Sequence, residues 1–63
     1  MDYRLTYYDY KDPAHNEAGT DGNETYEFEE SSDNDAKQEV RYFCGKERLA
    51  LKLIALPNRV VEL

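Results

Sequence analysis

SSDNDAKQEVRYFCG, residues 31–45, carries the pattern of one amphipathic α-helix. Ser32 stands at the N-cap position, where its hydroxyl can accept a hydrogen bond from an early backbone N–H. Asp35 follows three residues later, at the spacing from which a carboxylate reaches back to the cap. Gly45 suits the left-handed conformation that ends many helices. The apolar residues recur at helical intervals and form one stripe: Ala36, Val40, Phe43 and Cys44.

A helix of this length is marginal alone in water, so it needs an apolar surface to cover. Residues 2–11 alternate as a half-buried strand does, and residues 24–30 have the pattern of a strand that returns beside it. The side chains expected to face the core are Tyr3, Leu5, Tyr7, Tyr26 and Phe28. Those expected on the opposite face are Arg4, Thr6, Tyr8, Tyr10, Thr25, Glu27 and Glu29.

Residues 12–23 lie between these two strands and contain Pro13, Gly19 and Gly22 but no long apolar side chain. This composition predicts a long, mobile loop within the first hairpin. Its length is near the upper end for an ordinary connection. A functional loop and a merely disordered one both fit that length.

The segment LALKLIAL, residues 49–56, is the most apolar stretch and fits two structures. Leu49, Leu51 and Leu53 alternate as in a strand, but leucine, alanine and lysine also form helices well. We favour a strand, followed by a turn at residues 57–58 and a short final strand at 59–63. Ile54 and Leu56 then lack cover within one chain, which indicates either a central strand or a subunit contact.

The expected element order is therefore β-β-α-β-β within a single domain, residues 1–63. One helix would pack on a mostly antiparallel sheet, giving a small two-layer α+β sandwich. A chain of 63 residues is long enough for one domain with a small core.

The charge of the chain is unevenly distributed. Residues 1–35 hold eleven acids against two bases, a net charge of −9, whereas residues 36–63 hold six bases against three acids, a net charge of +3. An acidic half attracts cationic surfaces and repels phosphate. The alternative is that these acids only keep a small domain soluble.

No pattern of catalytic or cofactor-binding residues is present in the sequence. His15 is the single histidine, and flanking carboxylates on a flexible loop do not supply a zinc site. The segment that begins at Asp21 resembles the start of a calcium loop, but Tyr26 occupies the position that requires glycine. Cys44 lies on the apolar stripe and is expected to be a buried core residue. We therefore expect no enzymatic activity, no cofactor and no metal.

Three further features bear on where the protein acts. No apolar run approaches the roughly 20 residues of a membrane span. The N-terminal residues lack the basic and apolar regions of a signal peptide, and the single cysteine fits a reducing compartment. These features predict a cytoplasmic protein.

Tyrosines mixed with carboxylates favour a protein interface, because tyrosine supplies a large contact area at a low entropic cost. The hypothesis is a small, acidic, protein-binding inhibitor that mimics nucleic-acid charge and blocks a basic, nucleic-acid-binding partner, as viral or mobile-element proteins do. The candidate partner-binding residues are Tyr8, Tyr10, Glu24, Glu27, Glu29, Glu30, Asp33 and Asp35.

Two alternatives stay open at this point. The first is a structural or adaptor module that forms a homodimer through its C-terminal aliphatic strands. The second is direct nucleic-acid binding, in which Tyr8 and Tyr10 stack on unpaired bases.

Overall fold

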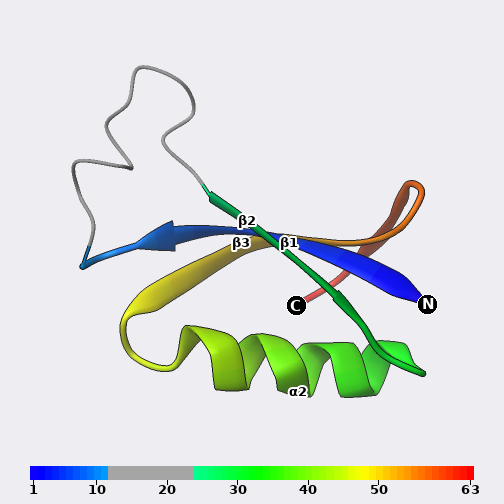
Figure 1. Cartoon of the computed structure of the whole chain (residues 1–63), viewed down its shortest axis with the longest axis horizontal. Helices are drawn as coiled ribbons and strands as arrows, with labels where there is room; N and C mark the ends of the chain where they lie inside the picture. Colours follow the sequence, from blue (N-terminus) through cyan, green and yellow to red (C-terminus); the bar gives the residue numbers. More distant parts are fainter. Residues whose placement is uncertain (12–23) are drawn as a thin grey trace.

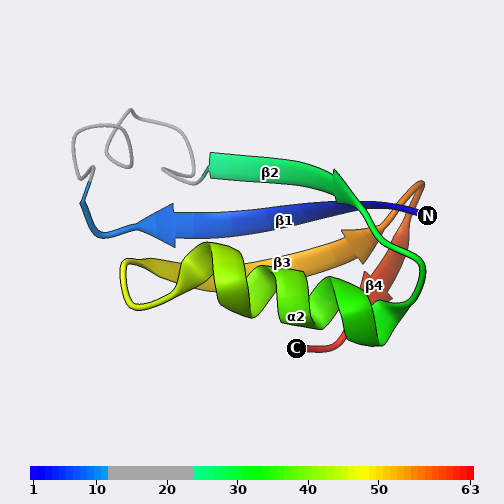
Figure 2. The ribbon, with the colours of Figure 1, turned by 60° about the horizontal axis from the view of Figure 1, so that its bottom comes forward.

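The computed structural model of the chain describes residues 1–11 and 24–63. The candidate metal-binding and loop features at residues 12–23, including His15, lie outside this part of the chain. Within it, four strands form one antiparallel sheet in the order β2-β1-β3-β4, and one helix lies along a single face (Figures 1 and 2). The elements are β1 (Asp2–Asp9), β2 (Glu24–Glu29), α2 (Asp33–Cys44), β3 (Arg48–Ala55) and β4 (Arg59–Val61). The predicted α+β sandwich and its element order are confirmed.

The helix begins and ends as its capping residues predict. Ser32 Oγ accepts a hydrogen bond from the backbone N–H of Asp35 at 3.2 Å. The Asp35 carboxylate also acts at this end, but it accepts from the Ser31 hydroxyl at 2.9 Å. Gly45 has a φ of +52° and donates its N–H to the carbonyl of Arg41. A side chain other than hydrogen would strain this left-handed position, so glycine closes the helix.

The core lies between α2 and the sheet face that it covers. Tyr3, Leu5 and Leu53 are fully buried there. The predicted helical stripe meets them, with Ala36, Val40 and Cys44 buried. Partly buried rings extend this core towards β2, where Tyr26 and Phe43 stack with their centroids 4.0 Å apart. All the side chains that alternation predicted to point inward from the first two strands do so.

The third strand is a strand, as favoured, but a β-bulge interrupts its alternation. Thr6 lies opposite Lys52 and Tyr7 lies opposite Ala50, so Leu51 is the extra residue. Plain alternation would place Leu51 and Leu53 on one face. The bulge breaks this pattern. As a result, Leu53 is 0 % exposed, whereas Leu51 is 45 % exposed.

The sheet face turned away from α2, here called the open face, carries the side chains that alternate with the core. On β1 and β2 these are polar, as predicted, and Arg4 lies opposite Glu27. On β3 and β4 they include the aliphatic Leu49 and Val60, which are 47 % and 60 % exposed. Ile54 is half-buried on this face, and its strand is central in the sheet, with β1 on one side and β4 on the other.

The bulge leads to a test of core packing with matched variants. We expect Leu53→Ala to lower the free energy of unfolding by about 2–5 kcal/mol, because it leaves a cavity in a small core. Leu51→Ala removes the same atoms from an exposed position and should lower it by less than about 1 kcal/mol. Urea denaturation followed by circular dichroism measures both. Equal losses for the two variants would contradict the bulged register.

Candidate functional site

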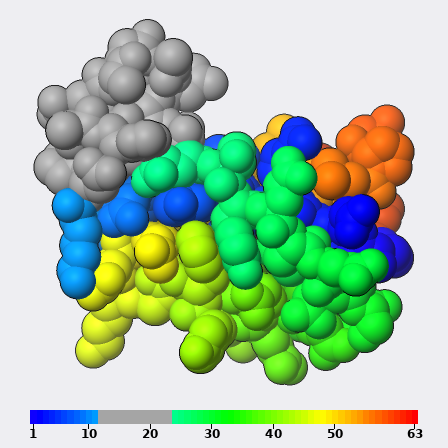
Figure 3. All heavy atoms as spheres, in the orientation of Figure 1, coloured from blue at the N-terminus to red at the C-terminus, as the bar shows by residue number. Residues whose placement is uncertain are grey.

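Acidic side chains gather where the start of β1, the end of β2 and the start of α2 meet. We call this surface the acidic edge. In the space-filling view, the end of β2 and the start of α2 form one continuous surface at the right-hand end of the molecule (Figure 3). The residues of the acidic edge are Asp2, Glu27, Glu29, Glu30, Asp35 and Glu39.

On the open face, the acidic edge contains two carboxylates in direct opposition. Asp2 lies opposite Glu29 in the antiparallel pairing of β1 and β2, and both side chains are exposed. Like charges at such positions destabilise a sheet. A shallow depression beside them is lined by Asp2, Glu27, Glu29, Phe28 and Leu56. Glu27 is paired with Arg4 at 2.9 Å across the same two strands.

Behind β2, the acidic edge continues around an exposed tyrosine. Tyr42 projects from α2 and is 87 % exposed, and it shares a second shallow depression with Glu30, Asp35 and Glu39. Glu39 is held in place because it accepts a 2.8 Å hydrogen bond from the hydroxyl of Tyr26. This hydrogen bond, together with burial, raises the pKa of Tyr26. Carboxylates around an aromatic ring are a suitable environment for a lysine or arginine side chain.

Asp33, a predicted partner-binding residue, is used inside the fold. Its two carboxylate oxygens accept hydrogen bonds from the Arg59 guanidinium at 2.7 and 2.9 Å, and Oδ1 also accepts from the Tyr3 hydroxyl at 2.7 Å. These hydrogen bonds from Arg59 and Tyr3 lower the pKa of Asp33 from 3.8 to about 2. The residue joins α2 to β4 and β1.

Tyr8 and Tyr10 lie near the opposite end of β1 from Asp2, about 20 Å away by the rise of a strand. Their rings contact each other with centroids 5.4 Å apart, and Tyr10 is exposed. Glu24 also lies at this end, opposite Tyr7. The structure therefore does not bring the eight predicted partner-binding residues into one patch. Direct nucleic-acid binding by Tyr8 and Tyr10 stays a prediction.

Two residues of the acidic edge, Asp2 and Glu39, are absent from the sequence-based site, and so is the neighbouring Tyr42. Two signals could have found them. Pairing the first two strands as a hairpin places the start of one beside the end of the other, which brings Asp2 to Glu29. Asp35, Glu39 and Tyr42 are also spaced four and three residues apart, so they share one helical face.

Arg48 does not join the other bases near the end of α2. Its Nη1 donates to the carbonyl of Phe43 at 2.7 Å, and its guanidinium lies over the Phe43 ring, 4.2 Å from the centroid. Its Nε is 3.4 Å from a carboxylate oxygen of Asp9. Arg48 thus caps the helix C-terminus and packs on the core edge. Arg41 and Lys46 are exposed.

In the part of the chain that the structure describes, three or more metal-ligating side chains do not come together. No helix among the same residues is long and apolar enough to cross a membrane. Burial raises the pKa of the Cys44 thiol, which fits its predicted place in the core.

No protein-family model matches the sequence, and comparisons with curated proteins and with solved structures give no significant match. The residues themselves therefore carry the functional argument.

The hydrogen bonds of Asp33 with Arg59 and Tyr3 make the stability of the fold depend on pH in the acid range. The pKa of Asp33 is lower in the folded state, so its stabilising contribution is present above pH 3.8 and is lost as pH falls towards 2. We expect Asp33→Asn to lower the melting temperature at pH 7 and to flatten the acid-induced fall between pH 4 and 2. Thermal unfolding followed by circular dichroism across this range measures both effects.

Asp35→Asn is the matched control, because Asp35 lies in the same helical turn but bonds to Ser31. This variant should keep the acid-induced fall of the wild-type protein. The same acid response in Asp33→Asn as in the wild type would refute the assignment.

Proposed function

We propose that this protein is a non-enzymatic binding module whose acidic edge receives lysine and arginine side chains of a basic protein partner. The observation that carries the proposal is the opposition of Asp2 and Glu29 across β1 and β2. Neither carboxylate forms an ion pair with another described residue. A cationic partner would relieve their repulsion. The free energy lost to this repulsion in the isolated protein would then contribute to binding.

The acidic edge also has the features of a recognition surface. Its carboxylates lie on two sides of one edge strand, and several are held by internal hydrogen bonds before any partner arrives. Tyr42 adds an exposed aromatic ring at little entropic cost, since tyrosine has few rotatable bonds. Preorganised groups of this kind lose less freedom on binding.

The proposal extends to the kind of partner. Grooves that bind nucleic acid are lined with lysine and arginine for contact with phosphates. The carboxylates of Glu27 and Glu29 repeat along β2 at about 7 Å, because alternate residues of a strand share a face. Glu27 is paired with Arg4, so the charges left for the groove are those of the opposed Asp2 and Glu29, which offer it a substitute for phosphates. Occupation of the groove would make the protein an inhibitor of nucleic-acid binding.

The test uses a double variant whose two effects go in opposite directions. Asp2→Asn with Glu29→Gln removes the opposed charges. We therefore expect the free energy of unfolding to be equal to or higher than that of the wild type. Binding should fall, because the same charges attract the partner. Immobilised protein is exposed to a cell lysate, and the proteins released by high salt and by added DNA are identified by mass spectrometry.

The control is Glu47→Gln with Glu62→Gln, which removes the same net charge from exposed positions outside the acidic edge, with the loss of the ion pair between Glu47 and Lys11. The control should retain the nucleic-acid-binding proteins that the wild type retains. Equal retention by both double variants would argue against the acidic edge. Retention that neither salt nor DNA reduces would argue against charge mimicry.

A second candidate function, a module that forms a homodimer, is favoured by the aliphatic part of the open face. Val60 lies opposite the half-buried Ile54 on the open face and is 60 % exposed, and Leu49 lies farther along β3 on the same face and is 47 % exposed. Exposed aliphatic side chains on a sheet surface are a feature of protein contacts. Two copies packed through this face would cover the side chains that one chain leaves exposed.

Solution mass separates this candidate from a monomeric binding module. If the homodimer forms, sedimentation equilibrium should give twice the 7.4 kDa chain mass, and Val60→Glu on the open face should return the mass to that of a single chain. Leu63→Glu is the control, since Leu63 is exposed but lies outside the open face, beside α2. A single-chain mass for the wild type at high concentration would exclude the homodimer.

A further inference from the structure

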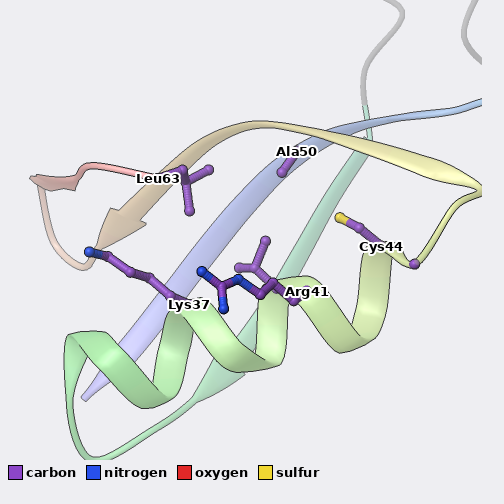
Figure 4. A pocket seen from close by; sticks show the side chains of 7 residues that line it. Lys37, Arg41, Cys44, Ala50 and Leu63 are labelled. Carbon is purple, nitrogen blue, oxygen red and sulfur yellow. The ribbon is translucent and has the colours of Figure 1, made fainter.

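A hollow of about 330 Å³ opens between α2 and β3, away from the acidic edge. Val40 and Cys44 line it from the helix, Ala50 lines it from β3, and Leu63 lies at its side. Figure 4 shows Ala50 directed from the strand towards the helix, with the side chains of Lys37 and Arg41 extending from α2 at the rim. The hollow therefore has an apolar interior and a cationic border.

Side-chain size explains why the hollow exists on this side of the helix. Towards β2, the helix packs through stacked rings, including the pair Tyr26 and Phe43. Towards β3, two small side chains line the space between the elements, Cys44 from the helix and Ala50 from the strand. The space that rings fill on one side is thus left open on the other.

Beside the hollow, the backbone of β3 lacks a neighbouring strand. β4 pairs only with Leu53, Ile54 and Ala55. Residues 48–52 of β3 have β1 on one side and, among the described strands, none on the other. An unpaired strand edge offers backbone N–H and C=O groups to an added strand.

The charge at the rim indicates what kind of strand would fit. Lys37 and Arg41 are one helical turn apart, and neither forms an ion pair with another described side chain. The part of the chain to which the hollow belongs, residues 36–63, has a net charge of +3. Carboxylates are therefore the complementary groups for this border, although the whole protein is acidic.

We propose that an extended peptide segment of a partner protein adds to the edge of β3 at residues 48–52. One aliphatic side chain of the segment enters the hollow, and acidic side chains two positions before and after it reach Lys37 and Arg41. This spacing follows from the strand period of two, which directs every second side chain to the same face. The site is separate from the acidic edge and does not depend on the function proposed for it.

The probe is a fluorescein-labelled peptide, Glu-Thr-Leu-Thr-Glu, which places leucine between two acids on one face and β-branched threonines on the other. Fluorescence polarisation measures its affinity for the whole protein. We expect peptides with alanine for the leucine, or with lysines for the glutamates, to bind at least about tenfold more weakly. These comparisons leave the protein unchanged, so they do not depend on the folding of a variant.

Two protein variants locate the site. Arg41→Glu should weaken the binding of the peptide by about tenfold, since it reverses a charge at the rim. Lys46→Glu makes the same charge change just beyond the helix, outside the hollow, and should bind as the wild type does. Circular dichroism checks that both variants keep the fold.

Amide hydrogen exchange tests the backbone pairing directly. Saturation with the peptide should slow exchange in residues 48–52, because some of their N–H groups become hydrogen-bonded. Unchanged exchange there, or equal weakening by Arg41→Glu and Lys46→Glu, would overturn the proposal. Protection that rises with protein concentration without peptide would also overturn it, since a second copy would then occupy this edge.

Discussion

Asp33 holds together the three parts of the fold that meet at the start of the helix. Its carboxylate accepts from Arg59 on β4 and from Tyr3 on β1, while its own backbone begins α2. Hydrogen bonds between charged groups are stronger than neutral ones, and the helix dipole favours a negative charge at this position. This junction fixes where the helix starts above the sheet. The apolar stripe of the helix can then meet Leu5 and Leu53 in a single register.

Most of the fold follows from local patterns in the sequence. The capping residues locate the helix, and alternation identifies the inward side chains of the first two strands. The β-bulge does not follow from them, because it depends on how Thr6 and Tyr7 pair with a strand more than 40 residues later. The role of Asp33 was equally hidden. An acid in the first helical turn is explained by the helix dipole, so nothing in the sequence pointed to Arg59.

The surface chemistry depends on the joining of β2 to α2 through a short connection. That connection brings acids from two different elements to one end of the molecule, whereas Lys37 and Arg41 border a hollow on the far side of the helix. The net charge of −6 therefore conceals two surfaces of opposite preference. The charge imbalance between the two halves of the chain is visible in the sequence. The distance between the tyrosines Tyr8 and Tyr10 and the acidic edge is not visible in the sequence, because it depends on how the strands pair in the sheet.

The central position of β1 also has a consequence for the order of folding. This strand pairs with β2 and with β3, so Tyr3 lies opposite Ala55 although nearly the whole chain separates them. Contacts between distant segments require a large loop to close and form more slowly than local ones. The hairpin and the helical turns can form from neighbouring residues, but the helical stripe is only partly covered until β3 arrives. Closure of the core is thus a late event, which requires β3 and also Val61 of β4.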